Sequence, residues 1–190
     1  SMAKVAANTL RKGMVVEYNN KLWVVMENEL RSPGKGAAVA QVVMRDIATG
    51  TKTDVRFSTQ DMVERARVDE EEYQYLFNDG DHYTFMHTET FDQIIVDKDL
   101  IGDPAVFLQE NMVCVMQINE GKALSVTLPE NVTMMITEAD PVVKGQTASS
   151  SYKPAVLENG ARVLVPPHIE AGTRIIVRTE DSSYVERAKD

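Results

Sequence analysis

The sequence predicts an all-β protein made of small barrels. Short runs rich in Val, Ile, Tyr and Trp recur along the chain, which is typical of strands. Pairs of turn-forming residues separate these runs: Asn19-Asn20, Thr49-Gly50 and Asp79-Gly80. Helix signals are confined to one short segment in the middle of the chain. Short strands joined by short turns favour several small barrels over one large layered sheet.

Residues 1–65 are predicted to form the first barrel. Strand-like runs follow one another as "MVVEY", "KLWVVMEN", "AAVAQVVMRDI" and "KTDVRF", each ended by a turn. This part of the chain is basic, because it holds ten Lys and Arg against seven Asp and Glu, a net charge of +3.

Residues 66–130 are predicted to form a five-stranded barrel of the oligonucleotide-binding (OB) type. Two aromatic-rich runs flank "NDGD", and Asp79-Gly80 there suits a hairpin with a type I′ turn. Pro104 at a first helical position, with Asp103 as cap, predicts one short helix ending at Gln109. The strands "MVCVMQI" and "KALSVTL" follow. This part is strongly acidic, with three Lys and Arg against fourteen Asp and Glu, a net charge of -11.

Residues 131–190 are predicted to form a third barrel, with the strands "ARVLVP", "RIIVRT" and "SYVERA" after a linker at Pro141 and Gly145. The run "VTMMITEA" before this linker is expected to continue the strands of the middle barrel. The small polar segment "QTASSSY" is predicted to be a mobile loop. The net charge here is -1, from seven Lys and Arg against eight Asp and Glu. A basic first third next to an acidic second third suggests separate domains facing different surroundings, although the acidic block could also be a solvated face.

Residues that could carry catalysis or bind a metal are few in this sequence. The histidines lack metal-ligand spacing and lie far apart, at His82, His87 and His168. Cys114 lies in an apolar strand-like run and is expected to be a small buried hydrophobe. A single cysteine excludes an internal disulfide, which favours a location in the reducing cytoplasm. No apolar run is long enough to cross a bilayer. We therefore expect no enzyme, no bound metal and no membrane contact.

The segment "SPGKG" places one lysine at the tip of a predicted turn. Pro33 presets φ for a turn, and Gly34 supplies the positive φ that a type II turn requires. Together with Ser32 and Gly36, they would present Lys35 on a narrow protruding tip whose backbone another molecule can approach closely. The long side chain carries a charge and can be acylated. An idle solvated lysine is the alternative interpretation from the local sequence alone.

Two further cations favour an interaction of this part of the chain with RNA. Arg31 precedes the turn and Arg45 follows it, and if they lay close to Lys35 the three would suit a nucleic-acid phosphate backbone.

Three ordered blocks of the sequence carry a resemblance to a known family. They are "SPGKGAA", "YLFNDGDHYTFMHTETFDQI" and "KPAVLENGARVLVPPHIEAGTRIIVRTEDSSYVERA". The chain resembles the bacterial translation elongation factor P family, with matches that run from Met2 to Ala188 in the family's order. The resemblance implies an SH3-like or KOW-like first barrel, two OB-fold barrels and an elongated, tRNA-like shape. It therefore assigns domains to residues 1–65, 66–130 and 131–190.

The resemblance also implies a function. Family members bind the 70S ribosome, with its rRNA and proteins, between the peptidyl and exit tRNA sites, and relieve stalling at consecutive prolines. Lys35 matches the residue that lies beside the CCA end of peptidyl-tRNA and is extended in many bacteria by a β-lysyl group. A lysine-modifying enzyme is thus an implied partner, no other cofactor is expected, and the protein is expected to act as a monomer in the cytoplasm.

Other implied RNA contacts lie in the last barrel. The loop "KGQTASSSY" matches a family loop near the exit-site mRNA codon, and it contains Gly145, Gln146 and Thr147. Many members have an aspartate where this chain has Gln146, which keeps a hydrogen-bonding amide but loses the charge. Tyr184 and Arg187 match family positions near the C-terminus, with strand packing and a solvated charge as their alternative roles.

Two rival functions remain open from the sequence. The chain could be an elongation-factor-P-like paralogue, or a generic RNA-binding β-barrel protein. The second would need aromatic stacking platforms exposed on the barrel faces, and it would bind free oligonucleotides strongly.

Overall fold

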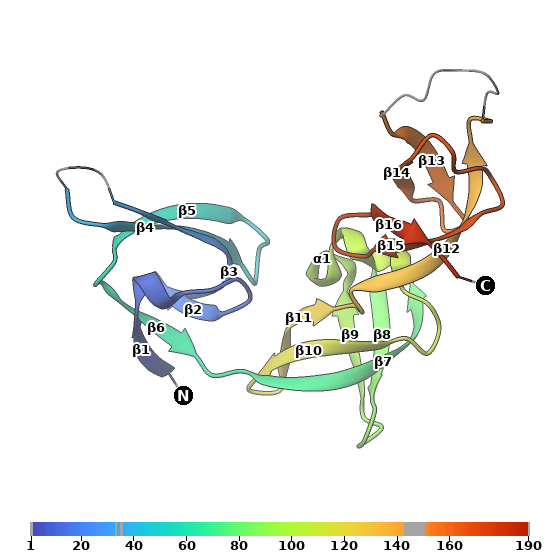
Figure 1. The fold of residues 1–190 in the computed structure, drawn as a ribbon. Coiled ribbons are helices and arrows are strands. Elements are labelled where there is room, and N and C mark those ends of the chain that lie inside the picture. The colour runs from blue at the N-terminus through green and yellow to red at the C-terminus, as the bar shows by residue number, and fades with distance from the viewer. Residues whose placement is uncertain (1, 33, 35, 143–150, 190) are drawn as a thin grey trace. The chain divides into compact units, whose positions relative to one another are not determined.

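The computed structural model describes residues 2–32, 34, 36–142 and 151–189, and these are mostly β-strand (Figure 1). The strands form three sheets, of six, five and five strands. The prediction of an all-β fold is therefore confirmed. Contacts along the chain divide it into two compact units: Ser1–Glu71 with Met116–Ser125, and Glu72–Val115 with Val126–Asp190.

The first sheet has the strand order β1-β6-β2-β3-β4-β5 and carries the short helix η1. The sheet curls, because β1 pairs with β6 although the two lie at opposite ends of this part of the sequence. Alternate side chains of the central strands point inward and build a buried core with Leu10, Val25 and Met44. The elements are β1 (Met2–Ala6), η1 (Ala7–Thr9), β2 (Val15–Tyr18), β3 (Lys21–Arg31), β4 (Val39–Asp46), β5 (Lys52–Ser58) and β6 (Met62–Ala66).

The turn between β2 and β3 has the geometry that its two asparagines predict. Tyr18 pairs with Lys21, and Asn19 and Asn20 between them have φ of 53° and 62°. Positive φ at both central positions defines a type I′ turn, and asparagine is among the residues that tolerate it. The turn predicted at Gly50 is also present, with φ of 77°.

The second sheet has the order β11-β10-β7-β8-β9, with two short helices between β9 and β10. Its elements are β7 (Asp69–Asp79), β8 (His82–His87), β9 (Gln93–Asp97), α1 (Lys98–Ile101), η2 (Asp103–Phe107), β10 (Val113–Asn119) and β11 (Lys122–Thr127). The predicted β7–β8 hairpin is confirmed, since Asp79 pairs with His82. The predicted type I′ turn is wrong. Such a turn needs positive φ at both central residues, which are Gly80 and Asp81, and only Gly80 has it.

The helix predicted from Asp103 to Gln109 needs correction. Gly102, with φ of 78°, precedes it, and the side chain of Asp103 makes no capping hydrogen bond. Pro104 does start a helical turn, but the segment is a 3-10 helix that ends at Phe107, because Leu108 is already extended. The residues before Gly102 form the strand β9 and the four-residue helix α1.

The third sheet has the order β14-β13-β12-β15-β16. The run "VTMMITEA", expected to continue the middle barrel, forms β12 at the centre of this sheet, because it pairs with β13 and β15. The strands are β12 (Asn131–Ala139), β13 (Lys153–Leu157), β14 (Arg162–Val165), β15 (Arg174–Arg178) and β16 (Ser183–Arg187). Buried side chains alternate along them, among them Ile136, Leu157 and Ile175. Most of the loop predicted to be mobile, "QTASSSY", lies outside the described residues.

The end of the β10–β11 hairpin belongs to the same compact unit as the first barrel. Leu124 is 2% exposed and packs in a cluster with Val15, Val24 and Ala66. The Gln117 side-chain amide donates a hydrogen bond to the Gly13 carbonyl at 2.9 Å. The hairpin thus completes a small core that the first 65 residues do not close by themselves.

Cys114 is buried, as its apolar flanks predict, and it is 1% exposed. Burial raises the pKa of its thiol to about 12, because the thiolate would lose its hydration. Among the described residues, no cluster of three or more His, Cys, Asp and Glu has the arrangement of a metal site. Within the same residues, no helix has both the length and the apolar character needed to span a membrane.

Candidate functional site at the end of the β3–β4 hairpin

The loop that carries Lys35 lies at the end of a long, well-paired hairpin. Arg31, the last residue of β3, pairs with Val39 at the start of β4. Val39 in turn pairs with Ser58 of β5, so three strands reach the base of the loop. The Thr59 amide also donates a hydrogen bond to the Ala38 carbonyl at 3.2 Å. The base of the loop is therefore fixed by backbone hydrogen bonds on both sides of β4.

The described residues of the loop are small and exposed. Ser32, Gly34 and Gly36 all face solvent. Apart from Gly34 itself and its two chain neighbours, no described heavy atom lies within 4 Å of the position where a Cβ on Gly34 would stand, so another molecule has room to approach the backbone there. Pro33 and Lys35 lie outside the described residues, and the predicted type II turn therefore stays a prediction.

The two described cations of the predicted cluster, Arg31 and Arg45, lie at opposite ends of the hairpin. Arg31 forms an exposed ion pair with Glu29, with Arg31 Nη2 3.2 Å from Glu29 Oε2. Arg45 pairs with Val24, whereas Arg31 pairs with Val39 at the other end of β4. Arg45 lies six positions after Val39 on the same strand, which is about 20 Å at the usual rise per residue. The interpretation that Arg31 and Arg45 lie together is wrong, because the hairpin is long.

Asn28 ties the hairpin to the N-terminal turn. Its side-chain Nδ2 donates hydrogen bonds to the carbonyls of Ala7 and Leu10, both at 3.0 Å. Its Oδ1 is buried and has no hydrogen-bond partner among the described residues. A lone asparagine inside an otherwise strand-like run was the only sequence signal for this contact, because asparagine is unfavourable in strands.

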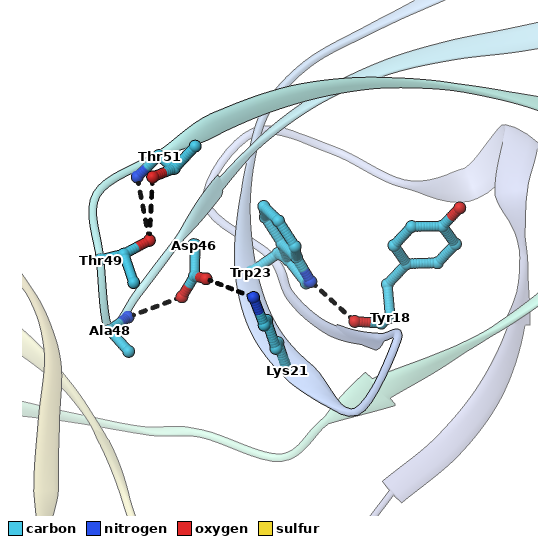
Figure 2. A network of polar contacts seen from close by, with 7 residues as sticks. All are labelled: Tyr18, Lys21, Trp23, Asp46, Ala48, Thr49 and Thr51. Atoms are coloured by element: carbon cyan, nitrogen blue, oxygen red, sulfur yellow. Dashed lines mark hydrogen bonds and ion pairs between the residues drawn. The ribbon is translucent and has the colours of Figure 1, made fainter.

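The opposite end of the hairpin is held by a buried carboxylate (Figure 2). The Asp46 side chain is 3% exposed, and its Oδ2 lies 3.7 Å from Lys21 Nζ. The Ala48 amide donates a hydrogen bond to Asp46 Oδ1 at 2.9 Å. Nearby, Trp23 Nε1 donates to the Tyr18 carbonyl at 2.8 Å.

These contacts lower the pKa of Asp46. Burial alone would raise it, because the charged form loses hydration. Hydrogen bonds from Ala48 and Thr49, together with the Lys21 ammonium, favour the charged form and outweigh burial, so the pKa lies below the usual value of 3.8. The hairpin is thus anchored by a carboxylate at one end and by Asn28 near the other.

The predicted contacts of the last barrel are described only in part. Tyr184 is partly buried and lines an open groove of about 590 Å³ with Tyr152 and Leu164. The two tyrosine rings meet edge to face, with centroids 6.3 Å apart. Burial and then Tyr152 raise the pKa of Tyr184. Arg187 is exposed on β16, and residues 145–147 lie outside the described part of the chain.

The fold, with an exposed loop at the end of one hairpin, defines an all-β protein of several barrels. It is similar to the solved structure of eukaryotic translation initiation factor 5A from Methanococcus jannaschii, with a TM-score of 0.50 and 21% sequence identity. The similarity covers 67% of this chain and 93% of that chain. At this identity it shows a shared fold.

Each sheet largely overlaps a segment that matches one part of the same protein family. Residues 6–63 match the elongation factor P KOW-like domain, residues 68–126 its OB domain and residues 132–187 its C-terminal part. Elongation factor P of Rhodospirillum centenum is 60% identical over 187 residues, 98% of this chain and 100% of that relative. Elongation factor P of Agrobacterium fabrum is 52% identical over 189 residues, with 100% of both chains covered. The chain therefore belongs to the elongation factor P family and is a translation elongation factor.

Proposed function

We propose that this protein binds the ribosome between the peptidyl and exit tRNA sites and promotes peptide-bond formation at consecutive prolines. The observation that carries the proposal is the family match through all three parts of the chain, including "SPGKGAA". The strand pairing at the base of the β3–β4 loop supports the proposal, because a long side chain is positioned more precisely when the backbone that carries it is held by rigid strands. In this proposal Lys35 contacts the CCA end of peptidyl-tRNA.

The chemistry of proline explains why such a factor is needed. Proline is a cyclic secondary amine with fixed φ, so it attacks poorly and restricts the path of the nascent chain. Holding the two tRNA-bound reacting groups in a productive orientation lowers the activation barrier of peptide-bond formation. Orientation of this kind can lower a barrier by on the order of 7 kcal/mol. The ribosome contributes the catalytic centre, so the protein itself needs no acid or base.

Lys35 would act as an extended cation. A β-lysyl group joined to its Nζ through an amide would lengthen the side chain and carry new ammonium groups. These could donate charge-assisted hydrogen bonds to phosphate and ribose oxygens. Intact-mass and peptide mass spectrometry of protein purified from its native host would test this. We expect added mass on the peptide that contains Lys35, and unmodified lysine there would contradict the modification.

The other proposed contacts follow from charge and position. The first 65 residues carry a net charge of +3 and would face RNA. Gly145, Gln146 and Thr147 would approach the exit-site mRNA codon, and Tyr184 and Arg187 would contact RNA beside the last barrel. A factor with these partners works in the cytoplasm.

A purified translation system provides the test of this function. One message encodes three consecutive prolines, and a matched message replaces them with alanines. We expect the modified protein to increase full-length product several-fold from the proline message and to leave the alanine message unchanged. Equal full-length product with and without the protein would overturn the proposal. Tight binding to free oligonucleotides without ribosomes would instead favour a generic RNA-binding protein.

A further inference from the structure

The strands β7, β8 and β9 are neighbours in the second sheet (Figure 1), and their pairing arranges side chains in rows on its outer face. Residues paired directly across antiparallel strands lie on the same face of a sheet. Phe77 pairs with Thr84, and Thr84 pairs with Ile95, so the three form one row. Tyr83 and Phe85, on either side of Thr84 in β8, are buried in the core. The row Phe77–Thr84–Ile95 therefore points away from the core.

The two apolar side chains at the ends of this row, Phe77 and Ile95, are open to solvent, whereas Thr84 between them is 6% exposed. Phe77 is 56% exposed and Ile95 is 64% exposed. On β10, the strand on the other side of β7, Val113 and Val115 are also exposed and alternate with buried Cys114. Large apolar side chains gathered on one face of a sheet, rather than scattered singly, are typical of an interaction surface.

Carboxylates lie next to Phe77 and Ile95 on this face of the sheet. Asp79, His82 and Asp97 pair across the same three strands and form the next row on this face. All three are exposed, and His82 Nε2 lies 3.8 Å from Asp97 Oδ1. The residues from 66 to 130 carry a net charge of -11, so the surrounding potential is negative as well.

The negative charge of this face favours a positively charged partner over nucleic acid, an anionic membrane or a second copy of this chain. In OB folds the face of the second and third strands commonly binds oligonucleotides. Here those strands are β8 and β9, and their face carries carboxylates and aliphatic side chains. Phosphates would be repelled, and so would the anionic surface of a membrane. A second copy of this chain would bring the same negative charge to the contact.

We propose that the outer face of β7–β8–β9 docks a basic protein segment, not RNA. The aliphatic stems of its Lys and Arg side chains would lie on Phe77 and Ile95, while their charged ends reach Asp79 and Asp97. This inference rests on the proposed function, because the ribosome is where the factor would meet basic proteins. The face would then hold the acidic domain against ribosomal protein while other parts of the chain face RNA.

Photo-crosslinking on 70S ribosomes tests the proposal directly. Phe77 is replaced by benzoylphenylalanine in the full chain, and the control places the same group at Phe91. Phe91 is 65% exposed but lies in the turn between β8 and β9, away from the face. We expect Phe77 to crosslink to a Lys- and Arg-rich peptide of a ribosomal protein, several-fold more than Phe91 does. Crosslinks to rRNA, tRNA or a second copy, or a yield no higher than that of Phe91, would overturn the proposal.

A charge-reversal pair provides the second test. Asp79→Lys with Asp97→Lys is compared with Glu89→Lys and Glu110→Lys, which make the same net change on exposed sites off the face. We expect the first pair to weaken 70S binding about tenfold at 0.1 M salt and the control pair to change it less than about twofold. Equal effects would contradict docking at this face. Failure of the parent chain to bind ribosomes at all would instead refute the proposed function, and this inference with it.

Discussion

Cys114 shows how burial controls the chemistry of a single residue. Its thiol has a pKa of about 12, above the ordinary value of 9.0, so very little thiolate exists at pH 8 in the folded protein. We expect iodoacetamide to leave Cys114 unmodified in the native protein at pH 8 and to alkylate it fully in denaturant. Mass spectrometry before and after unfolding checks this. Rapid alkylation of the native protein would show that the thiol is accessible.

Local backbone chemistry made some single residues predictable. The pair Asn19-Asn20 predicts a turn, and both residues adopt positive φ in the structure. The role of Asn28 could not be predicted, because its partners at Ala7 and Leu10 are distant in sequence. Lys35 was singled out first by its neighbours Gly34 and Gly36 and then by the resemblance, and its contacts stay a prediction.

At the scale of elements, Asp46 links the hairpin to the turn that follows it. Because its pKa is lowered on folding, its charged form stabilises the folded state above pH 3.8, and this contribution is lost as the pH falls through the lowered value. We expect Asp46→Asn to lower the free energy of unfolding at pH 7, with the difference from the parent shrinking below about pH 4. Urea titrations between pH 3 and pH 7 measure it. Asp54→Asn, at an exposed carboxylate of β5, is the control, and an equal effect there would contradict the role of Asp46.

The β10–β11 hairpin makes a second prediction at this scale. Leu124 is buried with Val15, Val24 and Ala66, so Leu124→Ala should leave a cavity and cost about 2–4 kcal/mol of unfolding free energy. Leu30→Ala is the matched control, because Leu30 is 54% exposed in the same compact unit, and it should cost less than about 1 kcal/mol. Denaturant unfolding compares the two. Equal losses would show that the hairpin does not contribute to this core.

Strands could be predicted from the sequence better than the segment between β9 and β10. Val- and Ile-rich runs bounded by turn residues mark strands by local signals alone. The predicted helix from Asp103 to Gln109 is instead a 3-10 helix that ends at Phe107, where Leu108 becomes extended, and no local sequence signal marks that early end. The place of Leu124 in the core of the first barrel is a long-range contact, which no local pattern encodes.

For the whole molecule, composition predicted the class of fold but not its function. The change from +3 to -11 between the first and second thirds suggested different surroundings for these parts. The structure adds detail to that contrast, because the acidic part exposes Phe77 and Ile95 beside two aspartates. The family was predicted from three ordered blocks of sequence, and the family matches confirm it. The domain limits at residues 65 and 130 stay predictions.

We propose that the protein acts on peptidyl-tRNA through Lys35, and a single comparison of variants tests this role. Full-length product from a message with consecutive prolines is measured with the modified parent, with Lys35→Ala and with Lys52→Ala. Lys52 is an exposed cation of β5 that pairs with Arg45, at the far end of β4 from the loop. We predict that Lys35→Ala reduces the product to the level without factor while Lys52→Ala keeps it near that of the parent. Normal activity of a folded Lys35→Ala variant would contradict the account.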